Sequence, residues 1–386
     1  MYNTVIIAVI VIKNNKGKRR RNLMKKKILA ALLCATMAVS MMACGSASDT
    51  ASSTDTAAES SDAGADAEAT ADASEFKIGL VTDVGGVNDQ SFNQSAWEGL
   101  QKAESELGVT VNYLESKTDS DYNGNIESFI DEDYDLIICV GYMLADATKA
   151  AAEANPDVNF AIIDDASIDL DNVTSLTFKA EQASYLVGYV AGLTTEKNNV
   201  GIVLGMASET MHGFGYGYTA GVLDANPECK VQQINANTFS DSAVGKTSAN
   251  TMITNGADII FQAAGATGIG VIEACNEAGD GIYAIGVDQD QAYLAPDTVL
   301  TSAMKRVDVA VYDTVEDLVN GELKGGNVVY DLAAGGVDIA PTQDLLSPDV
   351  ISAVEDVKKK IVSGEITVPA TQEEFEAAYG DVYELD

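Results

Sequence analysis

Histidine is almost absent from this sequence: His212 is the only one among 386 residues. A Ser-His-Asp or Cys-His catalytic group needs an imidazole as general base, so such chemistry would have to run through His212. Nothing around His212 favours that role, and its position fits a polar residue at the start of a helix. We therefore expect no catalysis of these kinds.

Cysteine is also scarce. Cys34 and Cys44 lie near the amino terminus, which leaves Cys139, Cys229 and Cys275 in the rest of the chain. Three is an odd number and none of them is spaced as C-x-x-C, so neither a disulfide framework nor a zinc site is expected. We expect each to fill core volume as a small apolar side chain, and we expect no bound metal.

Basic residues are few outside the amino terminus. The chain has 23 Lys and Arg against 59 Asp and Glu, a formal net charge of −36. Nine of the basic residues fall in the first 43 positions, which hold no acidic residue, so the remainder carries about −45. Binding of nucleic acid through its phosphates needs the opposite charge and is excluded. Such a surface suits a self-repelling protein outside the cytoplasm, and we expect a monomer.

Long apolar runs are missing near the amino terminus as well. The first apolar run, Thr4 to Ile12, is too short to span a bilayer. It is followed by three consecutive arginines and then Met24, an order that fits translation of a purine-rich ribosome-binding site. We therefore expect residues 1–23 to lie upstream of the natural start.

The segment after Met24 has the layout of a secretion signal. Three lysines lead into the apolar run Ile28 to Leu33, and the segment ends in Ala43-Cys44. A small residue before a cysteine resembles a bacterial lipobox, in which the thiol is acylated and the cysteine becomes the new first residue. We expect residues 24–43 to be a lipoprotein signal peptide and diacylglycerol on Cys44 to anchor the chain to the extracytoplasmic face of the cell membrane. The alternative is an ordinary signal peptide cut at an A-x-A site.

A low-complexity segment follows the cysteine. Up to Ser74 it consists almost entirely of Ala, Ser, Thr, Asp, Glu and Gly, without apolar periodicity. Such a segment cannot bury enough apolar surface to offset the entropy lost on ordering. We expect residues 44–75 to be a disordered acidic tether.

From Phe76 onward, apolar strand-like runs alternate with amphipathic helix-like segments. That alternation predicts an α/β fold with parallel sheets and helical crossovers. The series runs twice, which predicts a type I periplasmic-binding fold: two Rossmann-like lobes joined by a multi-strand hinge, with the ligand cleft between them. We assign residues 76–178 and 302–322 to the first lobe and residues 179–301 and 323–386 to the second.

One loop gathers acidic, amide and aromatic side chains directly after the first strand-like run, Ile78 to Val81. Loops at the carboxyl ends of parallel strands are where such sheets bind ligands, although this composition also fits a solvated turn. The motif D-x-G-G-x-N-D-x-S-F-N-Q-x-A-x-x-G-L, from Asp83 to Leu100, resembles the opening of the basic membrane lipoprotein family. These are purine-nucleoside-binding lipoproteins of certain ABC importers, and the resemblance spans about residues 76–365.

The resemblance implies a binding site made of residues from both lobes, most of them at strand ends. The predicted ligand-binding residues are Asp83, Asn88, Asp89, Phe92, Asp164, Phe214, Gly265, Asp288 and Lys305. Asp164 would accept hydrogen bonds from the vicinal diol of a ribose, and Asp288 from ring N–H or exocyclic groups of a purine. Phe92 and Phe214 would stack on the two faces of the base.

Several of these assignments have a simpler alternative. Asp164 could cap a turn or exchange roles with the adjacent Asp165. Phe214 could pack in the core of a glycine-rich helix. Lys305 could be a surface charge or the partner of Asp308.

The glycine-rich stretch Gly265 to Gly270 has the order G-x-x-G-x-G, which is not the dinucleotide fingerprint, and no phosphate-binding lysine accompanies it. A nucleotide-phosphate site is therefore rejected and no cofactor is expected. Gly265 would instead let the backbone approach an uncharged ligand closely. A cleft with four aspartates and one lysine is net negative, which favours a nucleoside over a nucleotide.

The resemblance thus implies a lipid-anchored solute-binding component of an ABC importer, which captures purine nucleosides and delivers them to the permease and its ATPase. Alternatives in the same fold are a carrier of riboflavin or a sugar, and a sensor domain. An enzyme is disfavoured, because Asp83-Val84-Gly85 lacks the Ser or Thr of an aspartic-protease motif and no second such motif occurs.

Overall fold

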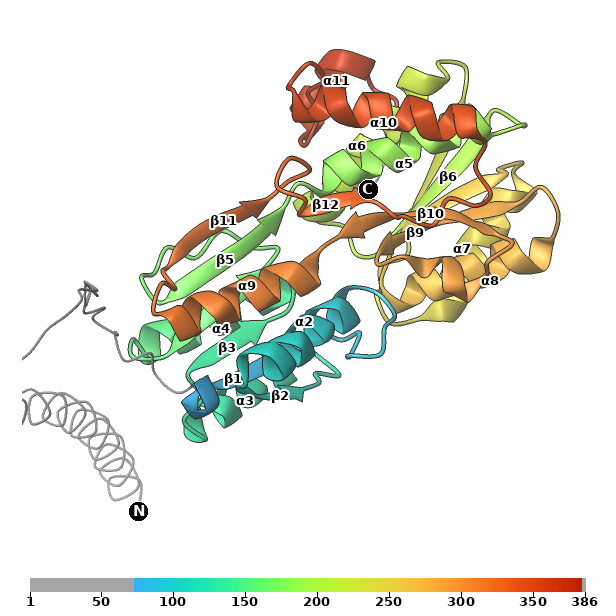
Figure 1. Ribbon diagram of the computed structural model, residues 1–386. Coiled ribbons are helices and arrows are strands. Elements are labelled where there is room, and N and C mark those ends of the chain that lie inside the picture. The colour runs from blue at the N-terminus through green and yellow to red at the C-terminus, as the bar shows by residue number, and fades with distance from the viewer. Residues whose placement is uncertain (1–72, 384–386) are drawn as a thin grey trace, which may run out of the picture. The chain divides into compact units, whose positions relative to one another are not determined.

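Strands and helices alternate through most of the chain, and the strands form two separate six-stranded sheets (Figure 1). The computed structural model describes residues 73–383. The predictions for the signal peptide, Cys44 and nearly all of the tether therefore lie outside the described residues. The last three residues of the expected tether, Ala73–Glu75, form a short 3-10 helix (η1).

The first sheet has the strand order β11-β5-β4-β3-β1-β2, and every pairing in it is parallel. Its strands are β1 (Lys77–Val81), β2 (Thr110–Leu114), β3 (Leu136–Cys139), β4 (Asn159–Ile163), β5 (Val173–Phe178) and β11 (Gly326–Tyr330). Helices α2 (Phe92–Leu107) and α9 (Val307–Asn320) cover one face, and α3 (Asp121–Asp131) and α4 (Ala145–Ala154) cover the other. Because both faces are covered, the central strands are apolar and buried almost throughout.

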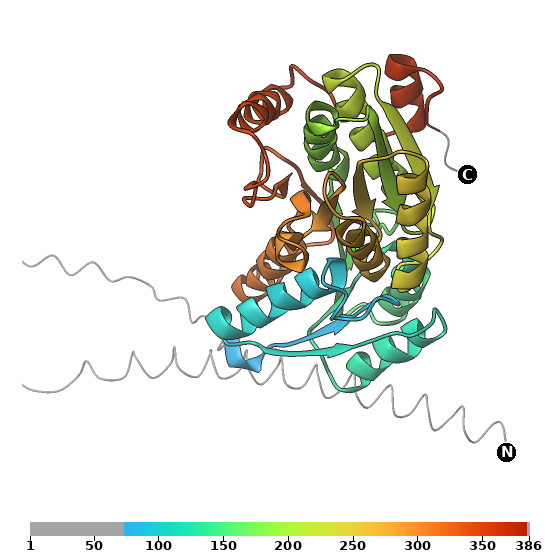
Figure 2. The ribbon, with the colours of Figure 1, turned by 90° about the vertical axis from the view of Figure 1, so that its right-hand side faces the viewer.

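The second sheet repeats this layout in the order β12-β10-β9-β8-β6-β7. Its strands are β6 (Asn199–Leu204), β7 (Lys230–Asn235), β8 (Ile259–Ala263), β9 (Tyr283–Asp288), β10 (Val299–Lys305) and β12 (Val337–Ile339). Helices α5 (Ala180–Thr194) and α6 (Glu209–Ala225) lie on one face, and α7 (Ser242–Thr254) and α8 (Ala266–Ala278) on the other. The last helices, α10 (Pro348–Val362) and α11 (Gln372–Tyr379), pack outside α5 and α6 (Figures 1 and 2).

Two sheets of matching strand order confirm the predicted two-lobed α/β fold. One detail differs: β12 runs antiparallel to β10, whereas parallel strands were expected throughout. This strand is short and lies at the sheet edge, where the chain returns from the first lobe without a helical crossover. No helix within residues 73–383 is both long and apolar enough to cross a membrane.

Three segments carry the chain between the lobes, at residues 178–180, 305–307 and 330–337. They are hydrogen-bonded to one another: Lys179 N donates to Tyr330 O and Arg306 N donates to Gly336 O, each at 2.9 Å. The lobes are therefore joined by three hydrogen-bonded segments rather than by one flexible linker.

The lobe boundaries differ from those expected. β10 pairs with β9 up to Met304, so residues 302–305 belong to the second lobe rather than the first. β11 pairs with β5, so residues 326–330 belong to the first lobe rather than the second. The sequence pattern indicates that such segments are extended, but the edge that a strand joins depends on contacts with residues distant in sequence.

Candidate functional site

A cavity lies between the lobes at the carboxyl ends of both sheets. The residues that line it are Asp83, Gly85, Asp89, Phe92, Asn93, Gly141, Tyr142, Met143, Asp164, Met211, Phe214, Phe239, Ala263, Ala264, Gly265, Val287, Asp288 and Lys305. Its volume is about 50 Å³, against roughly 300–1,000 Å³ for a typical small-molecule site. The lobes are thus closed on each other, and they must separate to admit a ligand.

The structure brings eight of the nine predicted ligand-binding residues to this one cavity. They are Asp83, Asp89, Phe92 and Asp164 from the first lobe, and Phe214, Gly265, Asp288 and Lys305 from the second. The ninth, Asn88, is exposed and does not line the cavity. Asn93, five positions further along the same motif, lies there instead.

Asp89 holds the start of helix α2. Its carboxylate accepts from the backbone N–H groups of Ser91, Asn93 and Gln94, at 2.9 to 3.0 Å. These are N–H groups of the kind that a helix leaves unpaired at its first turn. Asp89 therefore lines the cavity while its oxygens cap the helix, so the turn-forming and site-lining interpretations of this loop both hold.

Asn93 is a site residue that the sequence reasoning missed. Its amide Nδ2 donates to Asp83 Oδ1 at 2.7 Å and to Asp89 Oδ2 at 2.9 Å, which fixes the orientation of the carboxamide. Its Oδ1 is buried and has no hydrogen-bond partner in the protein. A buried acceptor left unpaired is costly, so a donor group placed beside Asn93 Oδ1 would relieve that cost.

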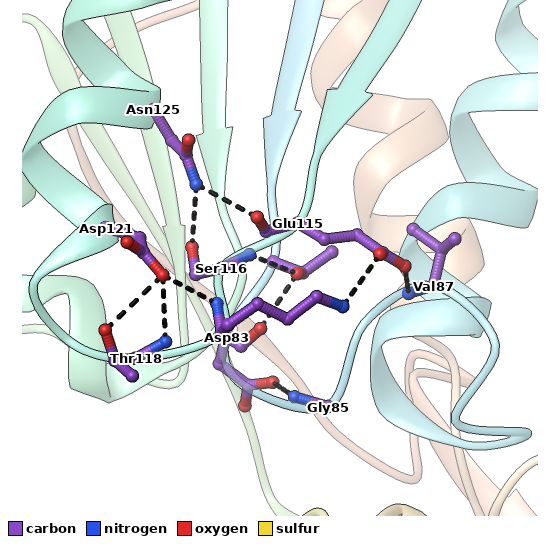
Figure 3. Close-up of polar contacts among 10 residues, drawn as sticks. Asp83, Gly85, Val87, Glu115, Ser116, Thr118, Asp121 and Asn125 are labelled. Carbon is purple, nitrogen blue, oxygen red and sulfur yellow. Dashed lines mark hydrogen bonds and ion pairs between the residues drawn. The ribbon is translucent and has the colours of Figure 1, made fainter.

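A neighbouring loop supports the β1–α2 loop (Figure 3). Glu115 Oε1 accepts from Val87 N at 3.1 Å, and Ser116 N donates to Thr82 Oγ1 at 3.4 Å. Gly86 has φ of +70°, and a Cβ there would stand 2.8 Å from Glu115 Oε1. The second glycine of the motif thus lets the loop turn against Glu115 and holds Asp83 and Gly85 at the cavity.

Asp164 and Asp288 occupy equivalent positions in the two lobes. Asp164 directly follows β4 and Asp288 ends β9, and these strands hold the same place in their sheets. Both residues have left-handed backbones, with φ of +65° and +62°. Such a conformation is uncommon outside glycine but is tolerated best by Asp and Asn, and it is often found at functional sites.

Lys305 joins the lobes inside the cavity. It is 3% exposed, and its Nζ forms an ion pair with Asp164 of the first lobe. Asp308 pairs instead with Arg306, so neither the surface-charge alternative nor the Asp308 alternative for Lys305 holds. The neighbour Asp165 accepts from Ser167, and Asp164 rather than Asp165 lines the cavity.

Aromatic rings from both lobes surround this lysine. Lys305 Nζ lies 4.6 Å from the ring centroid of Phe92, 5.1 Å from that of Phe178 and 5.9 Å from that of Phe214. Phe214 also belongs to the core of the second lobe and is 3% exposed. It therefore packs in the core with one side and lines the cavity with another. Phe178 is a further aromatic residue near the site that the sequence reasoning did not single out.

Burial dominates the electrostatics of the carboxylates. It raises the pKa of Asp83 to about 6 and that of Asp288 to about 6, and it also raises the pKa of Asp89. For Asp288 the nearby Lys305 ammonium acts in the opposite direction, as does the hydrogen bond from Ser91 Oγ. The cavity thus offers acceptors and one ammonium but little compensation for an added anion.

Residues 76–372 match the model of the Bmp family, described as ABC transporter substrate-binding protein PnrA-like. The match covers more than three quarters of the chain. The chain belongs to this family. As a Bmp-family protein it is the solute-binding component of an ABC transporter and not an enzyme, which confirms both predictions at this level.

Relatives cover most of the folded part. The CD4+ T-cell-stimulating antigen of Listeria monocytogenes is 43% identical over 77% of this chain and 89% of its own length. The ABC transporter nucleoside-binding protein BmpA of Lactococcus lactis is 40% identical over 77% of this chain and 90% of its own length. A solved solute-binding protein of an Aeropyrum pernix ABC transporter system is 28% identical, with a TM-score of 0.73, over 80% of this chain and 97% of that one.

Among the other cavity residues of this Bmp-family protein, Tyr142, Met143 and Phe239 lacked a sequence signal. They are common loop and helix residues whose types carry no motif. Asn93 did have a signal, because it lies within the D-x-G-G-x-N-D-x-S-F-N motif. Choosing between its two asparagines required the hydrogen bonds of the folded loop.

Proposed function

We propose that this Bmp-family protein binds purine nucleosides between its lobes and delivers them to its transporter from a lipid anchor at Cys44. The observation that carries the proposal is the composition of the cavity, in which aromatic rings from both lobes share one buried space with acceptor side chains. A purine nucleoside has a flat base for the rings and N–H and O–H donors for the acceptors. The relative from Lactococcus lactis, named a nucleoside-binding protein, supports the same ligand class.

The polar groups divide into two sets. Asp164 and Lys305 form a buried donor–acceptor pair that suits the two adjacent hydroxyls of a ribose. Asp83, Asn93 and Asp288 form a second set of acceptors that suits the edge of a base. Closure removes water from both sets, so a ligand that leaves one of these groups unpaired binds more weakly.

The charge of the cavity argues for nucleosides over nucleotides. Asp83, Asp89, Asp164 and Asp288 line it together with one cation, Lys305, which is already paired with Asp164. An added phosphate would face this carboxylate excess in a desolvated space. Riboflavin and sugars remain alternatives, since a sugar fits the carboxylates and riboflavin also fits the rings.

Titration calorimetry with guanosine, guanosine monophosphate, riboflavin and ribose tests the ligand class. We expect heat of binding from guanosine and little from the other three. Tight binding of the monophosphate without binding of guanosine would overturn the proposal, and a response to riboflavin or ribose alone would favour the corresponding alternative.

The substitution Asp164→Asn tests the role given to the ribose pair. It removes the charge that holds Lys305, and we expect guanosine affinity to fall by about 10- to 100-fold, the effect of losing a buried charged hydrogen bond. The matched control is Asp165→Asn, which removes a neighbouring charge outside the cavity and should change affinity less than twofold. Equal effects of the two substitutions would remove Asp164 from the site.

A further inference from the structure

A chain of buried side-chain amides runs from the cavity wall of the second lobe to the backbone of the first. Gln262, on β8, accepts from Ala264 N at 3.1 Å through its Oε1. Its Nε2 donates to Gln291 Oε1 at 2.8 Å. The Nε2 of Gln291 in turn donates to Gln90 O of the first lobe at 2.8 Å.

Gln291 is the centre of this chain. It is fully buried at the start of η3 (Gln291–Leu294) and does not line the cavity. Its Oε1 also accepts from Val287 N at 2.9 Å, and its own N–H donates to Ser302 Oγ at 3.1 Å. The side chain is therefore fixed within the second lobe, and one donor remains to reach across the cleft.

The acceptor in the first lobe, Gln90 O, belongs to the β1–α2 loop. Gln90 lies between Asp89, which lines the cavity, and Ser91, whose Oγ donates to Asp288 of the opposite lobe. Its backbone is left-handed, with φ of +55°, an uncommon conformation for glutamine. Two adjacent residues of the β1–α2 loop thus bond the second lobe, one to a cavity-lining side chain and one to Gln291.

Besides the buried contacts Ser91–Asp288 and Lys305–Asp164 in the cavity, two exposed hydrogen bonds cross the cleft nearby. Gln289 Nε2 donates to Glu98 Oε2 at 3.0 Å, and Tyr293 OH donates to Gln90 Oε1 at 3.3 Å. Tyr293 is 57% exposed. Water competes with such bonds in the closed state, so they discriminate weakly between closed and open lobes, whereas the bond made by Gln291 is partly buried and its donor side chain is fully buried.

We propose that Gln291 is a positioning residue that holds the lobes closed without touching the ligand and so sets how long a bound ligand stays. Val287 and Ala264 line the cavity and are both bonded into the amide chain. A ligand that presses on this wall in its correct position keeps Gln291 aligned with Gln90 O, which couples ligand fit to closure. This inference rests on the proposed binding of purine nucleosides only for its kinetic readout.

The test is the near-isosteric substitution Gln291→Glu in the full chain. One glutamate oxygen can still accept from Val287 N and Gln262 Nε2, while the other replaces the donor that faces Gln90 O. We expect labelled guanosine to leave the variant about three- to tenfold faster than the wild type, which corresponds to one net hydrogen bond. The increase should shrink as the pH is lowered, because a protonated glutamate can again donate to Gln90 O.

The matched control is Tyr293→Phe, which removes an exposed bond across the same cleft and should leave the release rate within about twofold of the wild type. If Gln291→Glu does not fold, Gln291→Met replaces it; this variant also lacks the donor, and its faster release should not depend on pH. Small-angle X-ray scattering of the ligand-free chains gives a second readout, with a larger radius of gyration expected for either Gln291 variant.

The two proposals fail in different ways. A wild type that does not bind guanosine refutes the nucleoside function, and scattering alone then decides on Gln291. A wild type that binds guanosine, with release rate and radius of gyration unchanged in the Gln291 variants, refutes the role of Gln291 and leaves the binding function standing.

Discussion

Asp164 and Asp288 place a carboxylate at the same strand end of each lobe, and both do so with a left-handed backbone. For a residue other than glycine this conformation costs on the order of 1 kcal/mol. Desolvation of the Asp288 carboxylate adds to this cost, as its raised pKa of about 6 shows. A glycine would avoid the backbone cost and a neutral side chain would avoid the desolvation cost, so these aspartates lower the stability of the fold. Such a loss is expected where residues are kept for binding.

The raised pKa values predict how stability depends on pH. Asp83 and Asp288 both have folded-state pKa values of about 6, above the ordinary 3.8. Between about pH 4 and pH 6 the folded protein therefore holds protons that the unfolded chain has released. The stability that this proton binding contributes is fully present below about pH 4 and is lost as the pH rises through 6. Each group would lower the free energy of unfolding by on the order of 2–3 kcal/mol between these limits.

The substitution Asp288→Asn should remove one of these contributions. Urea unfolding at pH 4.5 and at pH 7.5 should show a smaller loss of stability in the variant than in the wild type. Asparagine tolerates the left-handed backbone and can still accept from Ser91 Oγ, so the fold is preserved. Asp165→Asn controls for loss of a charge; an identical pH dependence in Asp288→Asn and wild type would refute the assignment.

At this scale the sequence was informative where residue type and motif position coincide. Phe92 and the strand-end aspartates lie where the motif and the strand ends predicted them. The sequence reasoning chose Asn88 although Asn93 lines the cavity, because the choice depends on which carboxamide meets Asp83 and Asp89 after the loop has folded. No sequence motif singled out Gln291, since its proposed role in holding the lobes closed depends on partners distant in sequence.

Among the elements, helices α5 and α6 pack closely against each other in the second lobe. Small residues within α5, including Gly188 and Gly192, let its backbone approach α6 closely. A Cβ at Gly188 would lie 2.2 Å from the backbone oxygen of Tyr218 on α6. The two backbones touch at this point, so no larger side chain fits without moving a helix.

The substitution Gly188→Ala should therefore destabilise the protein although alanine is the better helix former. We expect a loss of about 1–3 kcal/mol from overpacking, measured by urea unfolding. Gly124→Ala on α3 is the matched control, because nothing lies within 4 Å of a Cβ there. It should raise stability by up to about 1 kcal/mol, the difference in helix propensity. Similar effects at both positions would contradict the packing argument.

Edge strands were the elements hardest to assign from sequence. β11 is a run of exposed residues, and Val328 and Val329 are 44% and 48% exposed. Its pattern predicts a strand but not a partner, and so it was placed in the wrong lobe. β12 has three residues, too few for any periodicity to predict it.

For the whole molecule, the proposed anchor at Cys44 determines where binding takes place. In a bacterial host, the wild-type chain should incorporate labelled palmitate and sediment with membranes. Cys44→Ala should abolish both while leaving guanosine affinity unchanged, because the cavity is built from residues 83–305. Cys34→Ala is the matched control and should behave as the wild type. Membrane association that survives in Cys44→Ala would point to another attachment.

The order of the chain has a consequence for its synthesis. The first sheet needs β11, and its apolar face needs α9, yet both are made after β10 of the second lobe. A nascent chain that ends near residue 300 would leave the core residues Leu100 and Ala103 without their cover. Folding therefore cannot proceed lobe by lobe as the polypeptide emerges, and the first lobe must wait until translation has passed residue 330.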